Sequence, residues 1–282
     1  MRIIRSIPEM QKICAALKRK GRTIGFVPTM GALHKGHLSL IQQARKDNRT
    51  IVVSIFVNPI QFALHEDLKA YPRPFKKDIP LLQKENVDFL FYPQAEKMYP
   101  ENFRTSVEVK VMGKVLCGVS RPDHFCGVAT VVTKLFNIIQ PDAAYFGQKD
   151  AQQATIIRRM ADDLNMPFKI KVMPTVRDTD GLALSSRNVY LNSQERQDSL
   201  VLSKALGLAR ELIRHGQRNA LCVINRMKAL IRTKKTAKIG YIAIVDSRTL
   251  NPVKIVGNNC LICLAVRFGK TRLIDNLLTR GE

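Results

Sequence analysis

The chain has 282 residues and 45% hydrophobic content, which is enough to bury one large core or two domains. No run approaches about 18 uncharged apolar residues, and the first ten residues lack a sustained apolar segment. We therefore expect neither a membrane span nor a secretory signal, and we predict a cytoplasmic protein.

The formal net charge is +23, from 46 Lys and Arg against 23 Asp and Glu. A charge of this size would suit a nucleic-acid-binding protein. The excess is spread along the chain, however, with only a modest cluster at Arg232, Lys234, Lys235 and Lys238, and interleaved aromatic residues are missing. We therefore expect an enzyme with anionic substrates and no nucleic-acid partner.

The six cysteines show no paired framework. Cys260 and Cys263 have a C-L-I-C spacing that could suggest zinc or redox chemistry, but they lie inside an apolar run without a second Cys or His pair nearby. We expect both to be buried strand residues, and we predict neither a disulfide nor a zinc site.

The first elements alternate helix and strand. Apolar positions on one face predict a helix over residues 7–20, and a β-friendly run follows at 24–27. Pro28 and Gly31 break this strand, and a helical pattern continues from about residue 36 to 48. In an open parallel sheet, such a junction directs backbone N–H groups and the helix dipole at an anion.

Two histidines, His34 and His37, lie in this turn with Gly36 between them. Imidazoles beside a helix N-terminus can donate hydrogen bonds to a polyphosphate, and the glycines let the backbone come close. The alternative is two unrelated surface histidines on a polar loop, because a short motif is a hypothesis until its context is known.

A β-branched run at 50–57 predicts a parallel strand buried on both faces. Gln61 and Tyr71 follow its carboxyl end, where ligand contacts are expected, although a loop stabilised by amide hydrogen bonds fits the local sequence equally well. Beyond them we predict a helix at 78–85, a strand at 87–92, a half-exposed strand at 106–111, a loop at 120–127 and a helix at 128–139.

The stretch F-G-Q-K-D-A-Q-Q at 146–153 repeats the order of strand, glycine and helix, with a strand at 143–146 and a helix at 151–164. Lys149 would supply a positive charge for a phosphate at the same sheet edge as the histidines. Asp150 is placed either to cap the helix or to coordinate magnesium, which takes one or two carboxylates plus nucleotide oxygens.

A strand at 168–173 precedes a mostly polar stretch at 176–191. Ser185, Ser186 and Arg187 could wrap an anion with two hydroxyls and a forked guanidinium, as a lid over a nucleotide would. The same residue types also populate ordinary loops and helix caps.

The pattern changes after residue 193. We predict helices at 193–215 and 219–233 and a small antiparallel sheet of strands at 239–245, 260–266 and 272–275. We place the domain boundary near residues 174–176, which gives domains of residues 1–175 and 176–282. The predicted fold class is α/β, a Rossmann-like doubly wound parallel sheet with a second, smaller α+β C-terminal domain.

Six motifs span almost the whole chain in order: P-T-M-G-A-L-H-K-G-H, S-I-F-V-N-P-I-Q-F, Y-P-R, F-G-Q-K-D-A-Q-Q, L-A-L-S-S-R-N and R-L-I-D-N. They resemble the pantothenate synthetase family, also called pantoate–β-alanine ligases, of the nucleotidyltransferase superfamily. The resemblance implies that ATP and pantoate give pantoyl adenylate and pyrophosphate, and that β-alanine then attacks the adenylate to give pantothenate and AMP. It also implies Mg²⁺ with the ATP, and a homodimer.

The resemblance further implies a set of site residues. Met30, His34 and His37 would contact ATP, with His37 as proton donor, while Gln61 and Gln153 would hold pantoate. The rest of the ATP site would comprise Gly147, Gln148, Lys149, Asp150, Val176, Leu184, Ser185, Ser186 and Arg187. We add Tyr71 as a substrate contact and Asp150 as a metal ligand, and we expect the catalytic groups to be His34, His37, Lys149 and Arg187.

The chemistry agrees with this set. Attack of a carboxylate on the α-phosphorus builds negative charge on the phosphoryl oxygens and the departing pyrophosphate, so catalysis needs positioned cations and hydrogen-bond donors. No nucleophilic side chain is required. The mixed anhydride must be kept from water, which gives residues 176–191 a reason to close over it.

Overall fold

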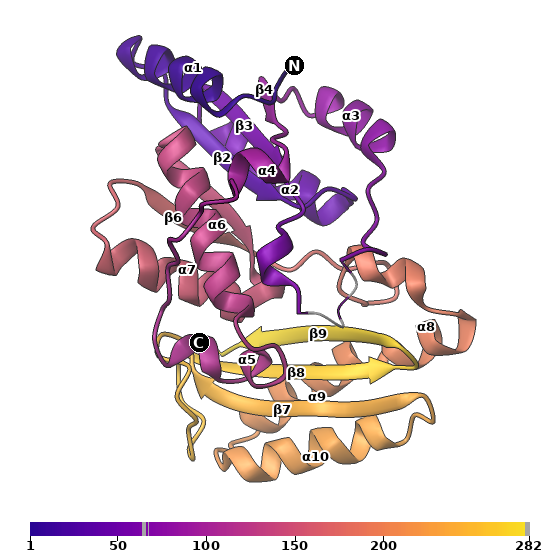
Figure 1. Ribbon diagram of the computed structural model, residues 1–282. Helices are drawn as coiled ribbons and strands as arrows, with labels where there is room; N and C mark the ends of the chain where they lie inside the picture. The colour runs from indigo at the N-terminus through magenta and orange to yellow at the C-terminus, as the bar shows by residue number, and fades with distance from the viewer. Residues whose placement is uncertain (64–65, 67, 280–282) are drawn as a thin grey trace. The chain divides into compact units, whose positions relative to one another are not determined.

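The computed structural model describes residues 1–63, 66 and 68–279, and these form two compact units (Figure 1). Unit 1 comprises Met1–Lys114, Gly118–Gly147 and Ile156–Pro174, and unit 2 comprises Val115–Cys117, Gln148–Thr155 and Thr175–Glu282. The chain therefore enters unit 2 twice before it stays there from residue 175 onward.

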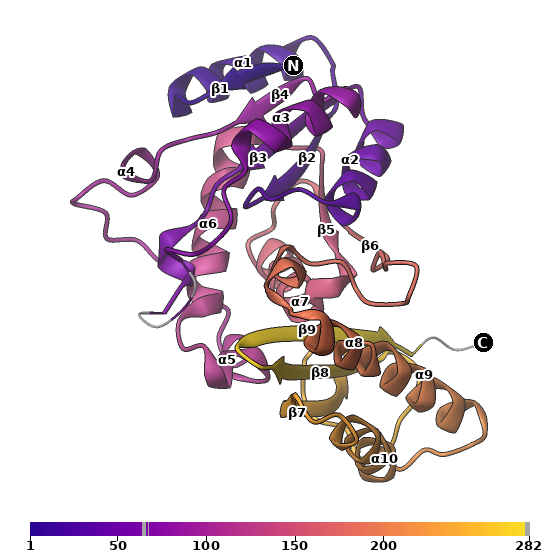
Figure 2. The same ribbon diagram turned by 90° about the vertical axis from the view of Figure 1, so that its right-hand side faces the viewer.

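Unit 1 is built on a six-stranded parallel sheet in the order β1-β4-β3-β2-β5-β6 (Figure 2). Its strands are β1 (Arg2–Ile4), β2 (Ile24–Thr29), β3 (Thr50–Ile55), β4 (Phe89–Phe91), β5 (Ala143–Gly147) and β6 (Lys169–Met173). From β2 the chain builds the sheet outward through β3 on one side and later through β5 on the other. The topological switch point, where open α/β sheets bind ligands, therefore lies between β2 and β5.

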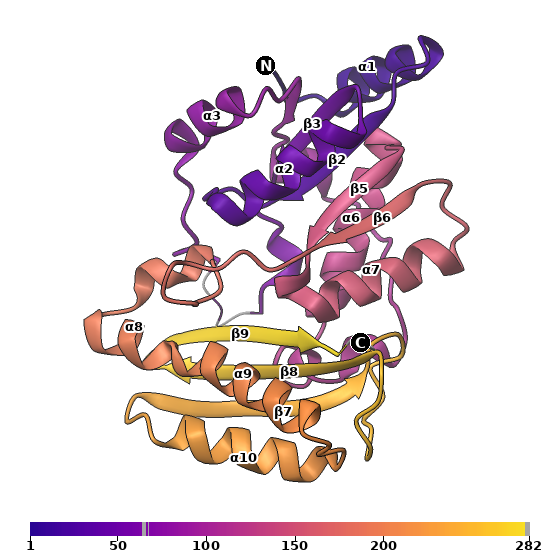
Figure 3. The same ribbon diagram turned by 180° about the vertical axis from the view of Figure 1, so that it is seen from behind.

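Helices cover both faces of this sheet (Figures 1 and 3). The helices and short 3-10 turns up to residue 163 are α1 (Ile7–Arg19), α2 (Lys35–Asp47), η1 (Pro59–Gln61), α3 (Phe75–Lys84), α4 (Ala95–Met98), η2 (Met112–Lys114), α5 (Cys117–Ser120), α6 (His124–Ile139), η3 (Gln148–Asp150) and α7 (Ala151–Asp163). Leu40 and Ile41 of α2 and Leu82 of α3 pack in the core on one face. On the other face, Phe136 of α6 meets Phe26 of β2 edge-on.

Unit 2 contains an antiparallel sheet in the order β7-β8-β9, formed by Ala237–Asp246, Cys260–Phe268 and Thr271–Leu278. It also contains η4 (Ser186–Tyr190), α8 (Ser193–Ser199), α9 (Val201–Arg214) and α10 (Ala220–Arg232). Apolar side chains of α9, α10 and the three strands form one core, and β9 is an edge strand. The predicted fold class, a Rossmann-like parallel sheet with a smaller α+β unit, is confirmed. Cys260 and Cys263 are both buried in β8, as predicted.

Three element predictions are wrong. Residues 106–111 belong to no described strand, and the Val107 N–H instead donates to Thr130 Oγ1 of α6. The expected loop at 120–127 ends early, because Asp123 adopts a left-handed conformation and α6 begins at His124. The single helix expected at 193–215 is divided into α8 and α9 at Leu200.

Within the described ranges, we find no helix long and apolar enough to cross a membrane.

Candidate active site

The turn after β2 is fixed by a carboxylate from α3. Gly31 and Ala32 have φ values of +82° and +52°, and this left-handed region strains residues other than glycine. Asp78 holds the strained turn, because its Oδ2 and Oδ1 accept hydrogen bonds from the N–H groups of Ala32 and Leu33, both at 2.9 Å. Burial raises the pKa of the Asp78 carboxyl above its ordinary value, although the two N–H groups act in the opposite direction.

The two histidines form a reciprocal cap at the start of α2. His34 is the N-cap residue, and its Nδ1 accepts a hydrogen bond from the Gly36 N–H at 3.2 Å. The His34 N–H in turn donates to His37 Nδ1 at 3.3 Å, and the two ring centroids lie 4.1 Å apart. An Nδ1 that accepts a hydrogen bond carries no proton, so these contacts leave Nε2 as the nitrogen of each ring that can donate.

Gly36 is required by this cap. A Cβ at residue 36 would lie 2.9 Å from His34 Cε1 and 3.0 Å from His34 Nδ1, closer than real Cβ contacts. A side chain here would therefore push the His34 ring away from its acceptor position.

Gln61 lies beside the turn in a network of hydrogen bonds. Its Nε2 donates to Met30 Sδ at 3.2 Å, and its Oε1 accepts from Asn58 Nδ2 at 3.0 Å. Asn58 is 1% exposed, and its Oδ1 accepts from the Tyr99 hydroxyl at 2.8 Å. Helix α6 approaches the turn η1 closely at Gly127. A glycine is required there, because a Cβ on Gly127 would lie 2.5 Å from the carbonyl oxygen of Ile60. These contacts leave the Gln61 amide with one orientation.

The backbone of Gln61 is held by a second chain of contacts. Its carbonyl oxygen accepts from His124 Nδ1 at 2.8 Å, and Arg121 Nη1 lies 3.0 Å from His124 Nε2. Arg121 also makes a bidentate pair with Glu66, with both N···O distances at 2.5 Å. Burial opposes ionisation of Glu66, but the hydrogen bonds and charge of Arg121 outweigh it, so the pKa of Glu66 is lowered. Tyr71 is 6% exposed and packs edge-on against Phe62, the residue after Gln61.

The predicted residues of unit 2 include the turn that follows Gly147 at the end of β5. Gln148, Lys149 and Asp150 form the 3-10 turn η3. Lys149 Nζ lies 3.7 Å from Asp150 Oδ1, and the Asp150 side chain is 50% exposed. Gln153 is half-buried on α7.

Val176, Leu184, Ser185 and Arg187 lie in one folded segment. The Leu184 N–H donates to the Val176 carbonyl oxygen at 3.0 Å and closes a short hairpin. Ser185 caps η4 and accepts from the Arg187 N–H at 3.3 Å, and Ser186 opens that turn. The structure therefore brings the two predicted hairpin positions, Val176 and Leu184, into direct contact.

Sequence reasoning missed the residues that hold these segments. They are Asp78 and Asn58 in unit 1 and Asp275 and Asn276 in unit 2. Asn58 stands inside a quoted motif, one residue before a proline, and Asp275 and Asn276 end the motif R-L-I-D-N. Membership of a motif was therefore the signal for three of them. Asp78 carried no such signal.

The chain has a Rossmann-like parallel sheet with polar groups fixed near its switch point. These features are typical of one class of protein, the α/β proteins that bind small ligands at the carboxyl edge of their strands. The family model described as pantoate-beta-alanine ligase matches residues 2–278. The chain belongs to this family, and it is an enzyme of the ligase class.

Relatives of the same family match the chain along its whole length. It is 54% identical over 278 residues to a pantothenate synthetase from Heliobacterium modesticaldum, and the match covers 99% of each chain. It is 50% identical over 282 residues to one from Caldicellulosiruptor bescii, with 100% of each chain covered.

Solved structures agree with these relatives. A crystal structure of pantothenate synthetase from Thermus thermophilus has a TM-score of 0.94 and 44% identity, with 100% of both chains covered. A crystal structure of pantoate-beta-alanine ligase from Francisella tularensis, in complex with beta-gamma ATP and beta-alanine, has a TM-score of 0.80 and 38% identity, with 99% and 97% covered.

Proposed function

We propose that this enzyme condenses pantoate with β-alanine through a pantoyl-adenylate intermediate and releases pyrophosphate and AMP. The observation that carries the proposal is the capped pair of His34 and His37 at the start of α2, in the turn after β2 whose Met30 accepts a hydrogen bond from Gln61. The complex of the Francisella tularensis relative supports ATP and β-alanine as two of the three substrates.

In the first step, the pantoate carboxylate attacks the α-phosphorus of ATP, and the bond to the pyrophosphate oxygen breaks. His34 and His37 would donate from Nε2 to phosphate oxygens as negative charge builds there, with His37 as proton donor, and Met30 would line the nucleotide site. Donors that are already oriented lower the barrier, because little reorganisation is needed when the reaction occurs.

The ATP contacts of unit 2 would come from its two folded segments. Lys149 would place a point charge and Arg187 a forked guanidinium against the phosphates. The nucleotide would also contact Gly147, Gln148, Asp150, Val176, Leu184, Ser185 and Ser186.

Gln61, Gln153 and Tyr71 would bind pantoate. The orientation of the Gln61 amide supports this role, because its Oε1 and Nε2 are already ordered by Asn58 and Met30. A preorganised amide loses little side-chain entropy when the substrate arrives. In the second step, the amine of β-alanine attacks the acyl carbon near Gln61, the bond to AMP breaks, and the amine loses a proton.

Asp150 fits Mg²⁺ as a single half-exposed carboxylate, because this ion commonly takes one or two carboxylates and completes its shell with water and phosphate oxygens. The described residues contain no group of three His, Cys, Asp or Glu side chains that could hold a metal without the nucleotide. When bound, Mg²⁺ would neutralise part of the triphosphate charge.

The test is pantoate-dependent exchange of labelled pyrophosphate into ATP. The purified enzyme should catalyse the exchange with pantoate alone, and AMP should accumulate only after β-alanine is added. Exchange that requires another acid, and is not supported by pantoate, would instead identify a nucleotidyltransferase with a different acceptor.

The proposed catalytic roles predict large losses in two variants. His37→Ala and Lys149→Ala should each lower the exchange rate by more than about a hundredfold, because each removes a donor to the developing charge. Far-ultraviolet circular dichroism should remain that of the parent protein. Near-normal exchange in either variant would contradict the role of that residue.

We also propose that the enzyme is a cytoplasmic homodimer. The dimer rests on the family resemblance, and the compartment rests on the need for ATP and on six cysteines that are all free thiols. Sedimentation at several protein concentrations should give a mass of two chains, and a monomer throughout would contradict the dimer.

A further inference from the structure

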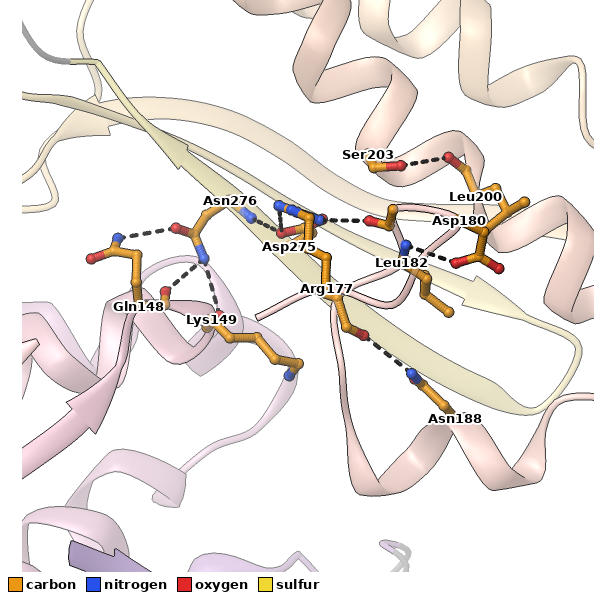
Figure 4. Close-up of polar contacts among 12 residues, drawn as sticks. Gln148, Lys149, Arg177, Asp180, Leu182, Asn188, Leu200, Ser203, Asp275 and Asn276 are labelled. Atoms are coloured by element: carbon orange, nitrogen blue, oxygen red, sulfur yellow. Dashed lines mark hydrogen bonds and ion pairs between the residues drawn. The ribbon is translucent and has the colours of Figure 1, made fainter. Parts of the chain in front are cut away.

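The last strand of unit 2 carries two polar residues that the proposed reaction does not use. Asp275 and Asn276 are 2% and 7% exposed, and they end the motif R-L-I-D-N. Successive strand residues face opposite sides of a sheet, so the two side chains leave β9 in opposite directions. Since β9 is an edge strand, other segments can pack beside it, and Figure 4 shows both side chains in contact with segments far away in the sequence.

Asn276 holds the Lys149 turn. Its Nδ2 donates to the carbonyl oxygens of Gln148 at 2.9 Å and Lys149 at 3.0 Å, and its Oδ1 accepts from Gln148 Nε2 at 3.0 Å (Figure 4). One amide therefore satisfies two consecutive carbonyls of η3, and it fixes the backbone from which the Lys149 side chain extends.

Asp275 holds the hairpin that begins at Val176. Its two oxygens accept from Arg177 Nη1 at 2.6 Å and Nη2 at 2.9 Å, and Oδ1 also accepts from the Asn276 N–H at 2.8 Å. Arg177 Nη1 donates as well to the Gly181 carbonyl oxygen at 3.1 Å, inside the same hairpin. The guanidinium thus attaches the whole hairpin to β9.

The position of Asp275 is unusual for a residue with only a structural role. Leu273 and Leu277, two residues away on either side, face the apolar core of unit 2, and Leu264 pairs with Asp275 across the strands. An apolar residue would suit this side of β9, where Leu273 and Leu277 flank Asp275. Replacing a buried ion pair by well-packed apolar side chains is often neutral or stabilising. Stability alone therefore does not account for a carboxylate here.

We propose that Asp275 and Asn276 are positioning residues for the ATP site. These consecutive residues of β9 fix two segments: Asn276 fixes the Lys149 turn, and Asp275 fixes the Val176–Leu184 hairpin through Arg177. The inference rests on the proposed function, in which both segments contact ATP. The pair sets the spacing between the proposed contacts on the two segments and touches no substrate itself.

The first test is Asn276→Asp, which keeps the size of the side chain but replaces the donating NH₂ with an oxygen that faces two carbonyl oxygens. We expect the Kd for ATP, measured by calorimetry, and the KM for ATP to rise about tenfold, with the KM for pantoate changed less than about twofold. Amide hydrogen exchange in residues 148–155 should accelerate. Thr279→Val is the matched control, because Thr279 lies just beyond the same strand and its hydroxyl hydrogen-bonds to Gly257 and Cys260, away from the Lys149 turn.

The second test is the double variant Arg177→Met with Asp275→Leu, which removes the ion pair and leaves an apolar side chain at the buried position on β9 and at its partner on the hairpin. The midpoint of thermal unfolding should stay close to that of the parent, while the KM for ATP should again rise about tenfold. Loss of stability with an unchanged KM for ATP would mean a structural pair only.

These outcomes separate the inference from the proposed function. If the parent enzyme does not exchange pyrophosphate into ATP when pantoate is present, the proposed function is contradicted. Calorimetry and amide hydrogen exchange would still measure the effect of Asn276 on ATP affinity and on the order of residues 148–155. The inference is overturned if the parent enzyme exchanges pyrophosphate normally but Asn276→Asp changes neither the affinity for ATP nor the amide hydrogen exchange of residues 148–155.

Discussion

His34 links the local fold of the turn to the chemistry proposed for it. N-cap positions are usually occupied by Ser, Thr, Asp or Asn, whose oxygen accepts an N–H of the first helical turn. Here an imidazole nitrogen accepts it, and this contact also decides which nitrogen carries the proton. Any change that displaces the ring therefore alters the helix start and the proposed phosphate donor together.

Gly36→Ala tests this coupling. The new Cβ collides with the His34 ring and weakens its N-cap, but alanine is favoured over glycine in a helix by about 1 kcal/mol, which is about what the cap contributes. We expect the exchange rate to fall about tenfold or more, with little change in the unfolding midpoint. Kinetics and thermal melts of the purified variant would measure both.

Gly207→Ala is the matched control, because a Cβ on this glycine of α9 would meet nothing within 4 Å. It should stabilise the protein by up to about 1 kcal/mol and leave the exchange rate unchanged. Equal activity in the two variants would show that the His34 ring tolerates displacement.

Single residues also show where sequence reasoning ends. The histidines, Lys149 and Gln61 were singled out because their chemistry and motifs are visible in the sequence. Asp78 was not, because its role depends on α3 packing behind a turn more than forty residues earlier. Anchors of this kind become visible only when the tertiary contacts are known.

At the scale of elements, a carboxylate at the C-terminus of α2 contacts two strands of the sheet. Asp47 Oδ2 accepts from Lys171 Nζ of β6 at 2.7 Å and from the Tyr145 hydroxyl of β5 at 2.8 Å. The hydrogen bond from Lys171 is the main reason that the pKa of Asp47 lies below its ordinary value. A proton on this carboxylate would weaken the contact of α2 with two strands.

The lowered pKa predicts a dependence of stability on pH. Because the folded pKa is below the unfolded one, the stabilisation by Asp47 is complete above the unfolded carboxyl pKa and is lost as pH falls through the folded pKa. Asp47→Asn should therefore be less stable than the parent at pH 7, and the difference should shrink in acid. Urea unfolding at a series of pH values would measure it, with the exposed Asp162→Asn as control. A difference that stays constant with pH would contradict this account.

The elements that the sequence predicted correctly are those with strong local patterns. β2, β3 and β5 are continuous apolar runs, and α2 and α6 have long periodic faces, so local physics determines them. The wrong prediction at 106–111 has an alternating pattern but no partner strand, and the three-residue strand β1 exists only because β4 pairs with it. Pairing partners are a property of the tertiary fold.

At the scale of the whole molecule, the charge of +23 should reduce stability through self-repulsion. Salt screens this repulsion, because the Debye length falls from about 30 Å at 0.01 M to about 8 Å at 0.15 M. We expect the thermal unfolding midpoint at pH 7 to rise when sodium chloride is added over this range. The rise should be much smaller near pH 10, close to the isoelectric point of 10.1, and an equal rise at both pH values would contradict the explanation.

The division into two units depends on contacts between residues far apart in the sequence. We place a boundary near residues 174–176, ahead of the polar stretch at 176–191, but no sequence pattern indicates the grouping of Val115–Cys117 and Gln148–Thr155 with unit 2. These segments join it through contacts such as those of Gln152 Oε1 with the Cys117 N–H and of Asn276 with the Gln148 carbonyl. Long-range hydrogen bonds of this kind leave no periodic signature.

This discontinuous arrangement has a consequence for biosynthesis. The first unit is fully translated by Pro174, so its sheet can form while the ribosome is still adding later residues. Gln148 precedes Asn276 by 128 positions, which corresponds to roughly 6 to 26 s at about 5–20 residues per second. During that interval the nascent segment 148–155 lacks the amide that later orders it, so this turn is synthesised near the middle of the chain and is among the last parts to mature.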